Sequence, residues 1–313
     1  MRIKCAIIYG EESDQHHVLM DSAKDYFDKV LAVPMDSLRV VYNEEGIKIM
    51  YKTTDLTDFD CVFLRVFGNE MLFGENIPEI LETEGVYTQV DVDSLTIASN
   101  KFYMIKVMED GDLPVPKTSY TLSTTETERA AESLNYPVII KIISGYGGKG
   151  VMKANQKSDL TPIIDTLTLF EQDICLQEYI ENPGEDIRII IIGDQTYAYK
   201  RIGGREEFRS NISAGGKREP YELSEEMEEV AVKAAKICGF DFCGIDIIEG
   251  QENGDFFIGE VNASPGIAGT EEVIEEPIAD LLMEYLYEQT LKKKTETKKR
   301  FKKETKEKKE SED

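Results

Sequence analysis

The chain has 313 residues and a formal net charge of −25, from 36 Lys and Arg against 61 Asp and Glu. This length suggests two or three domains, and a hydrophobic content of 41% excludes a wholly disordered chain. Residues 290–313 hold 11 Lys and Arg and 6 Asp and Glu, a net charge of +5, so residues 1–289 carry −30. A body this acidic would repel a phosphate backbone, which argues against DNA as a partner.

The sequence gives no sign of secretion or of a membrane. No stretch approaches the roughly 18 consecutive apolar residues of a membrane span, and the apolar run at 3–9 is too short for a signal peptide. The histidines, His16 and His17, are adjacent and far from most cysteines, so a structural zinc centre is not expected. We therefore expect a cytoplasmic protein with five reduced cysteines: Cys5, Cys61, Cys175, Cys238 and Cys243.

The first hundred residues alternate strand-like and helix-like segments. Strands are predicted at 3–9, 47–51 and 60–66, which favours an α/β domain with a mainly parallel sheet. A helix is predicted over 101–109, and the prolines at 114 and 116 then impose an extended backbone. We place a domain boundary near residues 99–100.

A strand at 138–142 runs into a glycine-rich loop. The loop matches G-x-G-x-x-G, which is a weak signal alone. A dinucleotide fingerprint would need a helix next, whereas 151–153 predicts a strand, and Lys149 is followed by Gly150 and not by the Ser or Thr of a Walker A loop. The strand lysine, Lys141, also precedes the loop, unlike the order in protein kinases. What remains is a glycine hairpin that can cover phosphates above Lys141, or an ordinary hairpin with a snorkelling lysine.

A strongly periodic helix is predicted near residue 230. Ser224 is a suitable N-cap and Gly239 can take the position after the helix end. The apolar residues between them follow i, i+3, i+4 spacing and predict one buried face: Met227, Val230, Ala231, Ala234, Ala235 and Cys238.

Two strands, at 244–249 and 256–262, predict a metal site. Read as an antiparallel hairpin with Glu249 opposite Phe257, they place Asp246 opposite Glu260 on one face, and Asn262 projects from that face too. Two carboxylates and an amide suit a hard cation such as Mg²⁺. The alternative, a solvated acidic surface, is weakened because these acids interrupt apolar strands.

Two further segments are weaker signals. A strand at 174–180 can offer backbone groups to a purine edge, and the acids just beyond it can accept ribose hydroxyls. Cations that could form the basic pocket an anionic ligand needs are Arg188, Lys200, Arg201 and Arg209.

The motifs, in this order and spacing, resemble the ATP-grasp ligases, and within them the RimK-type glutamate ligases. They are the glycine loop after a strand lysine, Gln-Glu-Tyr-Ile, Asp-Ile-Arg, Phe-Arg-Ser-Asn, Gly-Ile-Asp and Glu-Val-Asn-Ala-Ser-Pro-Gly. The resemblance is specific from residue 99 to about 286. It implies a mixed α/β and α+β chain, with a Rossmann-like pre-ATP-grasp domain at 1–99 followed by a small lobe at 100–184 and a large lobe at 185–289. Composition predicts that the tail at 290–313 is disordered or a frayed helix.

The resemblance also implies site residues. Residues implied to contact ATP are Lys101, Lys141, Gly145, Gly147, Gly148, Gly150, Glu178, Ile180, Asp186 and Arg201. Those implied to hold two Mg²⁺ or Mn²⁺ ions are Asp246, Glu260 and Asn262. Those implied to act on the reacting groups are Arg209, Asn211 and Arg188, with Arg65 and Ser264 near the substrate.

The implied reaction is ATP-dependent amide formation through an acyl phosphate, with L-glutamate added to an acceptor carboxylate. The acceptor is left open between the C-terminus of a ribosomal protein and the glutamyl tail of a deazaflavin or pterin coenzyme. A ligase for another amino acid or a peptide, or a nucleotide-binding regulatory protein without turnover, remain alternatives. The family also implies a homo-oligomer, either a dimer or a tetramer.

Overall fold

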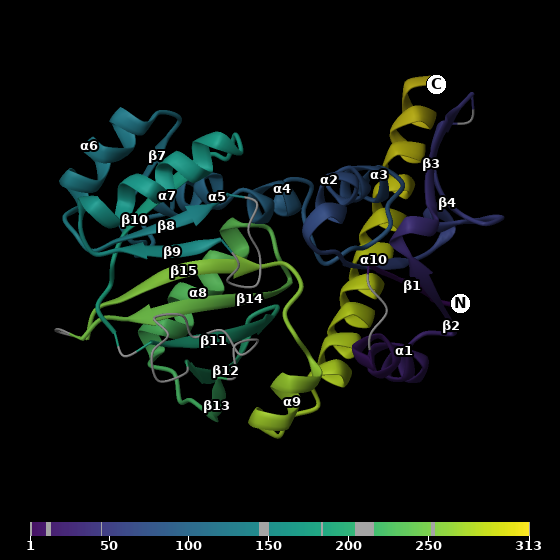
Figure 1. The fold of residues 1–313 in the computed structure, drawn as a ribbon. Coiled ribbons are helices and arrows are strands. Elements are labelled where there is room, and N and C mark those ends of the chain that lie inside the picture. Colours follow the sequence, from purple (N-terminus) through teal and green to yellow (C-terminus); the bar gives the residue numbers. More distant parts are fainter. Residues whose placement is uncertain are drawn as a thin grey trace. The chain divides into compact units, whose positions relative to one another are not determined.

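The computed structural model describes residues 2–10, 14–44, 46–143, 150–182, 184–203, 216–251 and 254–312. The chain forms two compact units, residues 1–92 with 266–313 and residues 93–265 (Figure 1). Sequence analysis placed residues 266–289 in the large lobe, whereas their contacts group them with the first unit. No helix in the described ranges is long and apolar enough to cross a membrane.

The first unit is built on a parallel sheet. Its strand order is β2-β1-β6. Sequence analysis predicted two of these strands, at 3–9 and 60–66, and both are confirmed. These strands are β1 (Lys4–Tyr9), β2 (Lys29–Pro34) and β6 (Cys61–Arg65), and α1 (Asp14–Tyr26) connects the first two. The strand predicted at 47–51 belongs instead to an antiparallel sheet of β3 (Leu38–Asn43), β4 (Gly46–Tyr51) and β5 (Thr54–Asp55).

Helices complete the first unit. Its further helices are α2 (Met71–Gly74), α3 (Ile77–Thr83), α9 (Ala268–Ile274) and α10 (Ile278–Glu312), and single 3₁₀ turns lie at Met35–Ser37, Leu56–Asp58 and Gly68–Glu70. Helix α10 packs against α1, and Ser22 donates a hydrogen bond to Asp280 between them (Figure 1).

The boundary expected at residue 289 lies inside α10. The helix continues to Glu312, so the structure shows a helix where composition suggested a disordered or frayed tail. Two observations explain why the helix continues past residue 289. Thr290 is fully buried, and the Lys294 ammonium pairs with the carboxylate of Asp60. Lys and Glu, which dominate the rest of the tail, also have high helix propensity.

The second unit begins with α4 (Ser94–Ser99) and α5 (Lys101–Asp110) and contains two sheets. The four-stranded sheet has the order β7-β10-β8-β9 and is covered on one face by α6 (Thr124–Leu134) and α7 (Lys157–Leu169) (Figure 1). Its strands are β7 (Thr118–Thr121), β8 (Val138–Ile142), β9 (Val151–Ala154) and β10 (Ile174–Glu178). The antiparallel pairing of β8 with β9 confirms the predicted hairpin.

The five-stranded sheet is antiparallel throughout, in the order β13-β12-β11-β14-β15. Its strands are β11 (Glu185–Ile192), β12 (Gln195–Ile202), β13 (Lys217–Pro220), β14 (Phe242–Glu249) and β15 (Phe256–Asn262). Helix α8 (Glu225–Ile237) has the predicted N-cap, because the Ser224 hydroxyl accepts a hydrogen bond from the Met227 N–H at 3.2 Å. Gly239 follows the helix with φ +73°, as expected.

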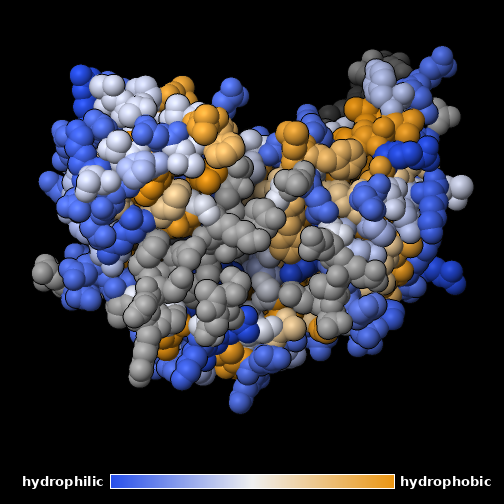
Figure 2. Space-filling view, viewed as in Figure 1, coloured by the Kyte–Doolittle hydropathy of each residue, from blue (hydrophilic) through white to orange (hydrophobic). Residues whose placement is uncertain are grey.

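The surface agrees with the composition. Hydrophilic residues cover most of the described surface on the face drawn in Figure 2, and apolar residues interrupt it in separate patches. The most exposed large apolar side chains, Tyr42, Leu72, Leu122 and Leu169, belong to different segments of the chain.

The contact between α10 and Asp60, which precedes β6, gives a prediction for stability. Lys294→Met leaves the Asp60 carboxylate, whose side chain is 11% exposed, without its ion-pair partner. We expect the free energy of unfolding to fall by about 1–3 kcal/mol, as measured by urea denaturation. Lys292→Met, at an exposed position on the same helix, is the control and should stay within about 0.5 kcal/mol of the parent. Equal stability of both variants would show that the ion pair does not anchor α10.

Candidate active site

In the four-stranded sheet, the face away from α6 and α7 carries the polar residues. The other face packs Val138, Ile140 and Leu176 against the two helices. Because side chains alternate along a strand, Lys141 lies on the face away from these two helices, directly opposite Cys175 of β10. Lys153 of β9 shares this face. The strand lysine is therefore not part of the apolar core beneath the two helices.

The five-stranded sheet also has one face that is not packed against its helix. Helix α8 lies on the opposite face, where Thr196 of β12 donates a 3.3 Å hydrogen bond to Glu228. The strand register places six predicted site residues together on the side away from α8. We call this side the charged face, and its residues are Asp186, Arg188, Arg201, Asp246, Glu260 and Asn262.

Asp246 is the centre of the charged face. Its carboxylate accepts hydrogen bonds from Nε and Nη2 of Arg188, the second at 2.9 Å, and an Nη2 of Arg201 lies 2.9 Å from Oδ2. The side-chain amide of Asn262 donates to Oδ2 at 3.2 Å. Burial alone would raise the pKa of Asp246, but the two guanidinium groups outweigh it and lower this pKa to about 2.

Arg201 links two strands to Asp246. Its Nε and Nη2 donate to the two oxygens of Asp186 at 2.6 and 2.5 Å, while Nη2 also reaches Asp246. Burial opposes its charge, yet Asp246 and Asp186 together raise the pKa of Arg201. Arg188 needs Gly244 beside it, because a Cβ there would lie 3.1 Å from its Cδ. The sequence predicted these residues but not that they pair with one another.

Two lysines approach the carboxylates from outside the five-stranded sheet. Lys101, at the start of α5, pairs with Glu260, and Asn100 caps this helix by accepting the Tyr103 N–H at 3.0 Å. The pKa of Lys141 is lowered mainly by burial and also by Lys101, while Glu260 opposes the shift. Lys101 and Lys141 therefore lie within electrostatic reach of one another and of the charged face.

The predicted hairpin register was right at the site and wrong at the turn. Asp246 lies opposite Glu260, as expected, but Glu249 lies opposite Phe256 and not Phe257. A register shift between Asp246 and Ile247 leaves Gly259 as an extra residue on β15. Counting back from the turn started at a wrong pair, Glu249 with Phe257, and still reached the correct pair, Asp246 with Glu260. The extra residue at the bulge cancels the one-residue error at the turn.

Lys200 does not belong to the predicted row of cations. It precedes Arg201 on β12 and so lies on the other face of the sheet. There its ammonium pairs with Glu185 at 3.1 Å and Glu249 at 3.5 Å.

The segment after β10 carries the residues expected near the purine. Glu178 accepts the Lys117 N–H at 2.7 Å and pairs with the Lys117 ammonium at 3.2 Å. The Lys153 ammonium lies 3.4 Å from the centre of the Tyr179 ring. Ile180 lies beside Gly250, because a Cβ added to this glycine would be 3.8 Å from the Cγ2 of Ile180. Sequence analysis missed Lys117 and Lys153, although the alternation of Lys141 and Lys153 across the hairpin could have indicated the second.

The remaining predicted residues are not all described by the structure. Gly145, Gly147, Gly148, Arg209 and Asn211 fall outside the described residues. Gly150 closes the glycine loop with φ +79°, which favours glycine. Ser264 follows β15 by two residues.

Arg65 belongs to the first unit. It lies at the carboxyl end of β6, opposite Tyr9 of β1, and is 3% exposed. Burial lowers the pKa of Arg65 to about 10.

The predicted ligands fit a hard cation. No group of three or more His, Cys, Asp or Glu side chains able to hold a metal ion occurs in the described parts of the chain, so the third protein ligand would be the amide of Asn262. Oδ1 of Asp246 accepts a single hydrogen bond in the described structure, from Arg188, and a carboxylate oxygen has a second lone pair for a cation. Two carboxylates and an amide oxygen are a donor set that suits Mg²⁺.

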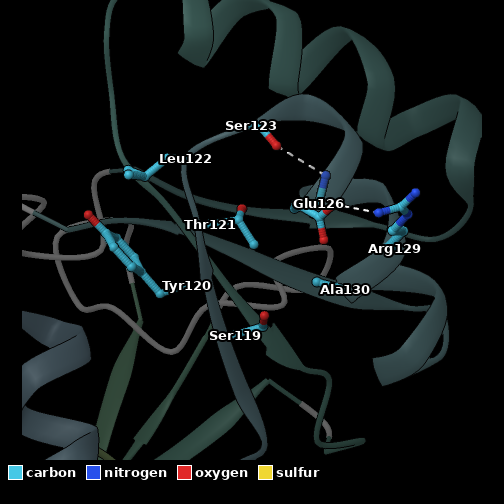
Figure 3. A pocket seen from close by; sticks show the side chains of 8 residues that line it. All are labelled: Ser119, Tyr120, Thr121, Leu122, Ser123, Glu126, Arg129 and Ala130. Atoms are coloured by element: carbon cyan, nitrogen blue, oxygen red, sulfur yellow. Dashed lines mark hydrogen bonds and ion pairs between the residues drawn. The ribbon is translucent and has the colours of Figure 1, made fainter.

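An open groove of about 580 Å³ lies elsewhere, between β7 and α6. Figure 3 shows Glu126 in this groove between Ser123 and Arg129, whose guanidinium it binds at 2.6 Å. The groove contains none of the predicted site residues, so it is separate from the charged face.

The lowered pKa of Asp246 predicts a pH dependence. Because its pKa is about 2 in the fold and near 3.8 otherwise, the charged carboxylate contributes stability above pH 4 that is lost as the pH falls towards 2, about 2 kcal/mol in all. In Asp246→Asn this component is absent, so the unfolding free energy should depend less steeply on pH between 4 and 2. Urea denaturation across this range measures it, with exposed Asp165→Asn as the control. An unchanged slope in Asp246→Asn would contradict the prediction.

Known proteins resemble this chain. Residues 98–286 match the RimK-like ATP-grasp domain. A probable alpha-L-glutamate ligase of Maridesulfovibrio salexigens is 32% identical over 80% of this chain and 83% of its own length. Another, of Vibrio cholerae, is 29% identical over 84% and 88%.

Solved structures share the fold. The ATP-grasp ligase PsnB, complexed with a phosphomimetic variant of its minimal precursor, Mg and ADP, superposes with a TM-score of 0.71 at 21% identity, covering 91% of this chain and 98% of that one. D-alanine–D-alanine ligase of Bacillus anthracis, complexed with ATP, gives 0.65 at 18% identity, covering 94% and 99%. With the family match over most of the second unit, these findings show that the chain belongs to the RimK-like ATP-grasp family and is an ATP-dependent ligase.

Proposed function

We propose that this ligase joins the amino group of L-glutamate to an acceptor carboxylate and converts ATP to ADP and phosphate. The observation that carries the proposal is the charged face, where guanidinium groups and oxygen ligands alternate around Asp246, with Lys101 and Lys141 close by. Relatives named probable alpha-L-glutamate ligase, 32% identical over 80% of the chain, support glutamate as the amine.

The nucleotide would lie between the two sheet faces that point away from α6, α7 and α8. Lys101 and Lys141 are the cations we assign to its phosphates, together with the glycine loop that ends at Gly150. The segment at Glu178 and Ile180 is assigned to the purine, and Asp186 to the ribose. Burial lowers the pKa of Lys141, and in such a partly desolvated setting the charged ammonium would attract a phosphate more strongly than a hydrated one does.

Asp246, Glu260 and Asn262 are the residues we assign to Mg²⁺, with two ions in the loaded enzyme. The ions would supply positive charge against the phosphate oxygens. The chain's own cations already neutralise these acids: Lys101 pairs with Glu260, and Arg188 and Arg201 pair with Asp246. These pairs hold the carboxylates in position on rigid strands.

The reaction needs no nucleophilic side chain. A carboxylate oxygen of the acceptor attacks the γ-phosphorus, and the bond from phosphorus to the ADP oxygen breaks, which gives an acyl phosphate. The glutamate nitrogen then attacks the acyl carbon, the bond to phosphate breaks, and the nitrogen loses a proton. Positioned cations stabilise the charge that develops in both steps. We assign this role to Arg188, Arg209 and Asn211, and a substrate contact to Ser264.

We propose an acceptor carboxylate on a protein C-terminus or on the glutamyl tail of a coenzyme. PsnB has been solved with its precursor peptide, which supports a peptide as one class of acceptor for this fold. Acceptor-dependent ADP release in the presence of ATP, Mg²⁺ and glutamate tests both classes. Nucleotide binding without ADP release for any acceptor would favour a regulatory protein. Mass spectrometry of products from an amino-acid mixture would reveal a ligase for another amino acid.

Removal of one proposed metal ligand gives a direct test. Glu260→Gln keeps a hydrogen-bond acceptor for Lys101 but loses the charge, so acceptor-dependent ADP release should fall by at least about 100-fold. The thermal unfolding midpoint should change little. The control, Glu229→Ala, alters an exposed acid on α8 and should retain parental activity. Parental activity in Glu260→Gln would refute the metal assignment.

A further inference from the structure

Strand β13 brings one more arginine to the charged face. Arg218 lies directly opposite Arg201 of β12, and Arg201 lies opposite Asp186 of β11. Residues opposite one another on neighbouring strands share a face. Arg218 is therefore at the outer end of the row that continues through Arg201 to Asp186, on the edge strand of the sheet (Figure 1).

Arg218 differs from the other arginines of this face in its partners. Arg188 and Arg201 each hold a carboxylate through two nitrogens. Arg218 is half-buried and lies 6.0 Å from the ring centre of Tyr199, and its buried Nε has no hydrogen-bond partner in the described structure. A buried donor without a partner costs about 1–3 kcal/mol. An anionic ligand on this guanidinium would remove that cost.

The other cations of the charged face are paired with carboxylates, and Arg218 is not, among the described residues. Lys101 is paired with Glu260, Arg188 with Asp246, and Arg201 with Asp186 and Asp246. Among residues with a described position, no carboxylate forms an ion pair with Arg218. Arg201 directly opposite is already neutralised by Asp186 and Asp246, so in this row of described residues Arg218 is the cation that remains available to an anion.

The place of Arg218 separates it from the phosphate cations. Lys101 contacts β15, and β13 and β15 are the two edges of the five-stranded sheet. Four strand spacings of about 4.8 Å place these edges roughly 19 Å apart. A group bound at Arg218 is thus a different part of the bound substrates from the phosphates near Lys101.

We propose that Arg218, supported by Tyr199 and Arg201, is a specificity-determining residue that binds a substrate carboxylate which takes no part in the reaction. The inference rests on the proposed ligase function. A guanidinium with a free edge binds a carboxylate through two parallel hydrogen bonds, which a neutral amide cannot match. Two sources supply such a group: the side chain of the incoming glutamate, or a second carboxylate on an acidic acceptor tail.

The variants are Arg218→Met, Arg218→Lys and Lys217→Met. Methionine keeps the apolar stem against Tyr199 and removes the charge, while lysine restores the charge without the planar fork. Lys217 is the matched control, because it is the exposed neighbour on the same strand and faces the other side of the sheet. Urea denaturation should give free energies of unfolding within about 1 kcal/mol for all three.

Calorimetry on the full chain with Mg²⁺ and a non-hydrolysable ATP analogue separates the sources. The probes are L-glutamate, L-glutamine, and a dipeptide of two glutamates with its side chains free or amidated. Arg218→Met should weaken either L-glutamate or the free dipeptide by about 10–100-fold and leave its amide counterpart unchanged. Arg218→Lys should recover part of the loss, and Lys217→Met should bind like the parent.

Kinetics give a second measurement. In Arg218→Met the KM for the affected substrate should rise by the same factor while kcat stays within about twofold. Unchanged affinity for all four probes would overturn the proposal, and so would weaker binding of the ATP analogue itself. Because the calorimetry needs no turnover, a parent protein that binds the probes but releases no ADP would refute the proposed function and not this inference.

Discussion

The buried carboxylate of Asp246 is the constraint on which the rest of the site depends. A charge on a buried strand is tolerated only if it is paired, and here two guanidinium groups and an amide surround it. The partners come from β11, β12 and β15, so a single charge connects four strands. Buried ion pairs add little net stability compared with apolar packing. We infer that the ion pairs of Asp246 fix the register of β14 in the sheet, because a slip of one residue would turn Asp246 towards α8.

In both sheets of the second unit, the alternation of side chains separates the residues that pack against helices from the candidate site residues. Helices α6 and α7 bury Ile140 and its neighbours, and the alternation of a strand then places Lys141 on the other face. In the five-stranded sheet, α8 packs on the side opposite the charged face. The site is thus built from positions that the hydrophobic core leaves free, and rigid strands hold its residues.

The sequence predicted those features that depend on local order. Alternation placed Asp246 opposite Glu260, and i, i+3, i+4 spacing with Ser224 predicted α8. The sequence-based predictions failed where the structure depends on contacts between segments that are distant along the chain. The bulge at Gly259 arises from the packing of β14 against β15, and the continuation of α10 past residue 289 involves Asp60, more than two hundred residues away.

The same limit explains the errors among the cations. Lys200 and Arg201 are neighbours in sequence, and only the assignment of a strand shows that they face opposite sides. The pairing of β12 with β13 cannot be read from spacing, because residues 203–216 separate the two strands. Arg218 was therefore not among the predicted residues.

The net charge of −25 has a smaller role at the site than its size suggests. At physiological ionic strength the Debye length is about 8 Å, so most surface acids are screened from a ligand on the charged face. Affinity for an anion there is decided by the cations within a few ångströms. Distant acids act instead on the rate of encounter, which favours a basic acceptor. An acidic body can therefore bind an anion such as ATP, provided that each local anion of the site has its own cation, as Asp246 and Glu260 do.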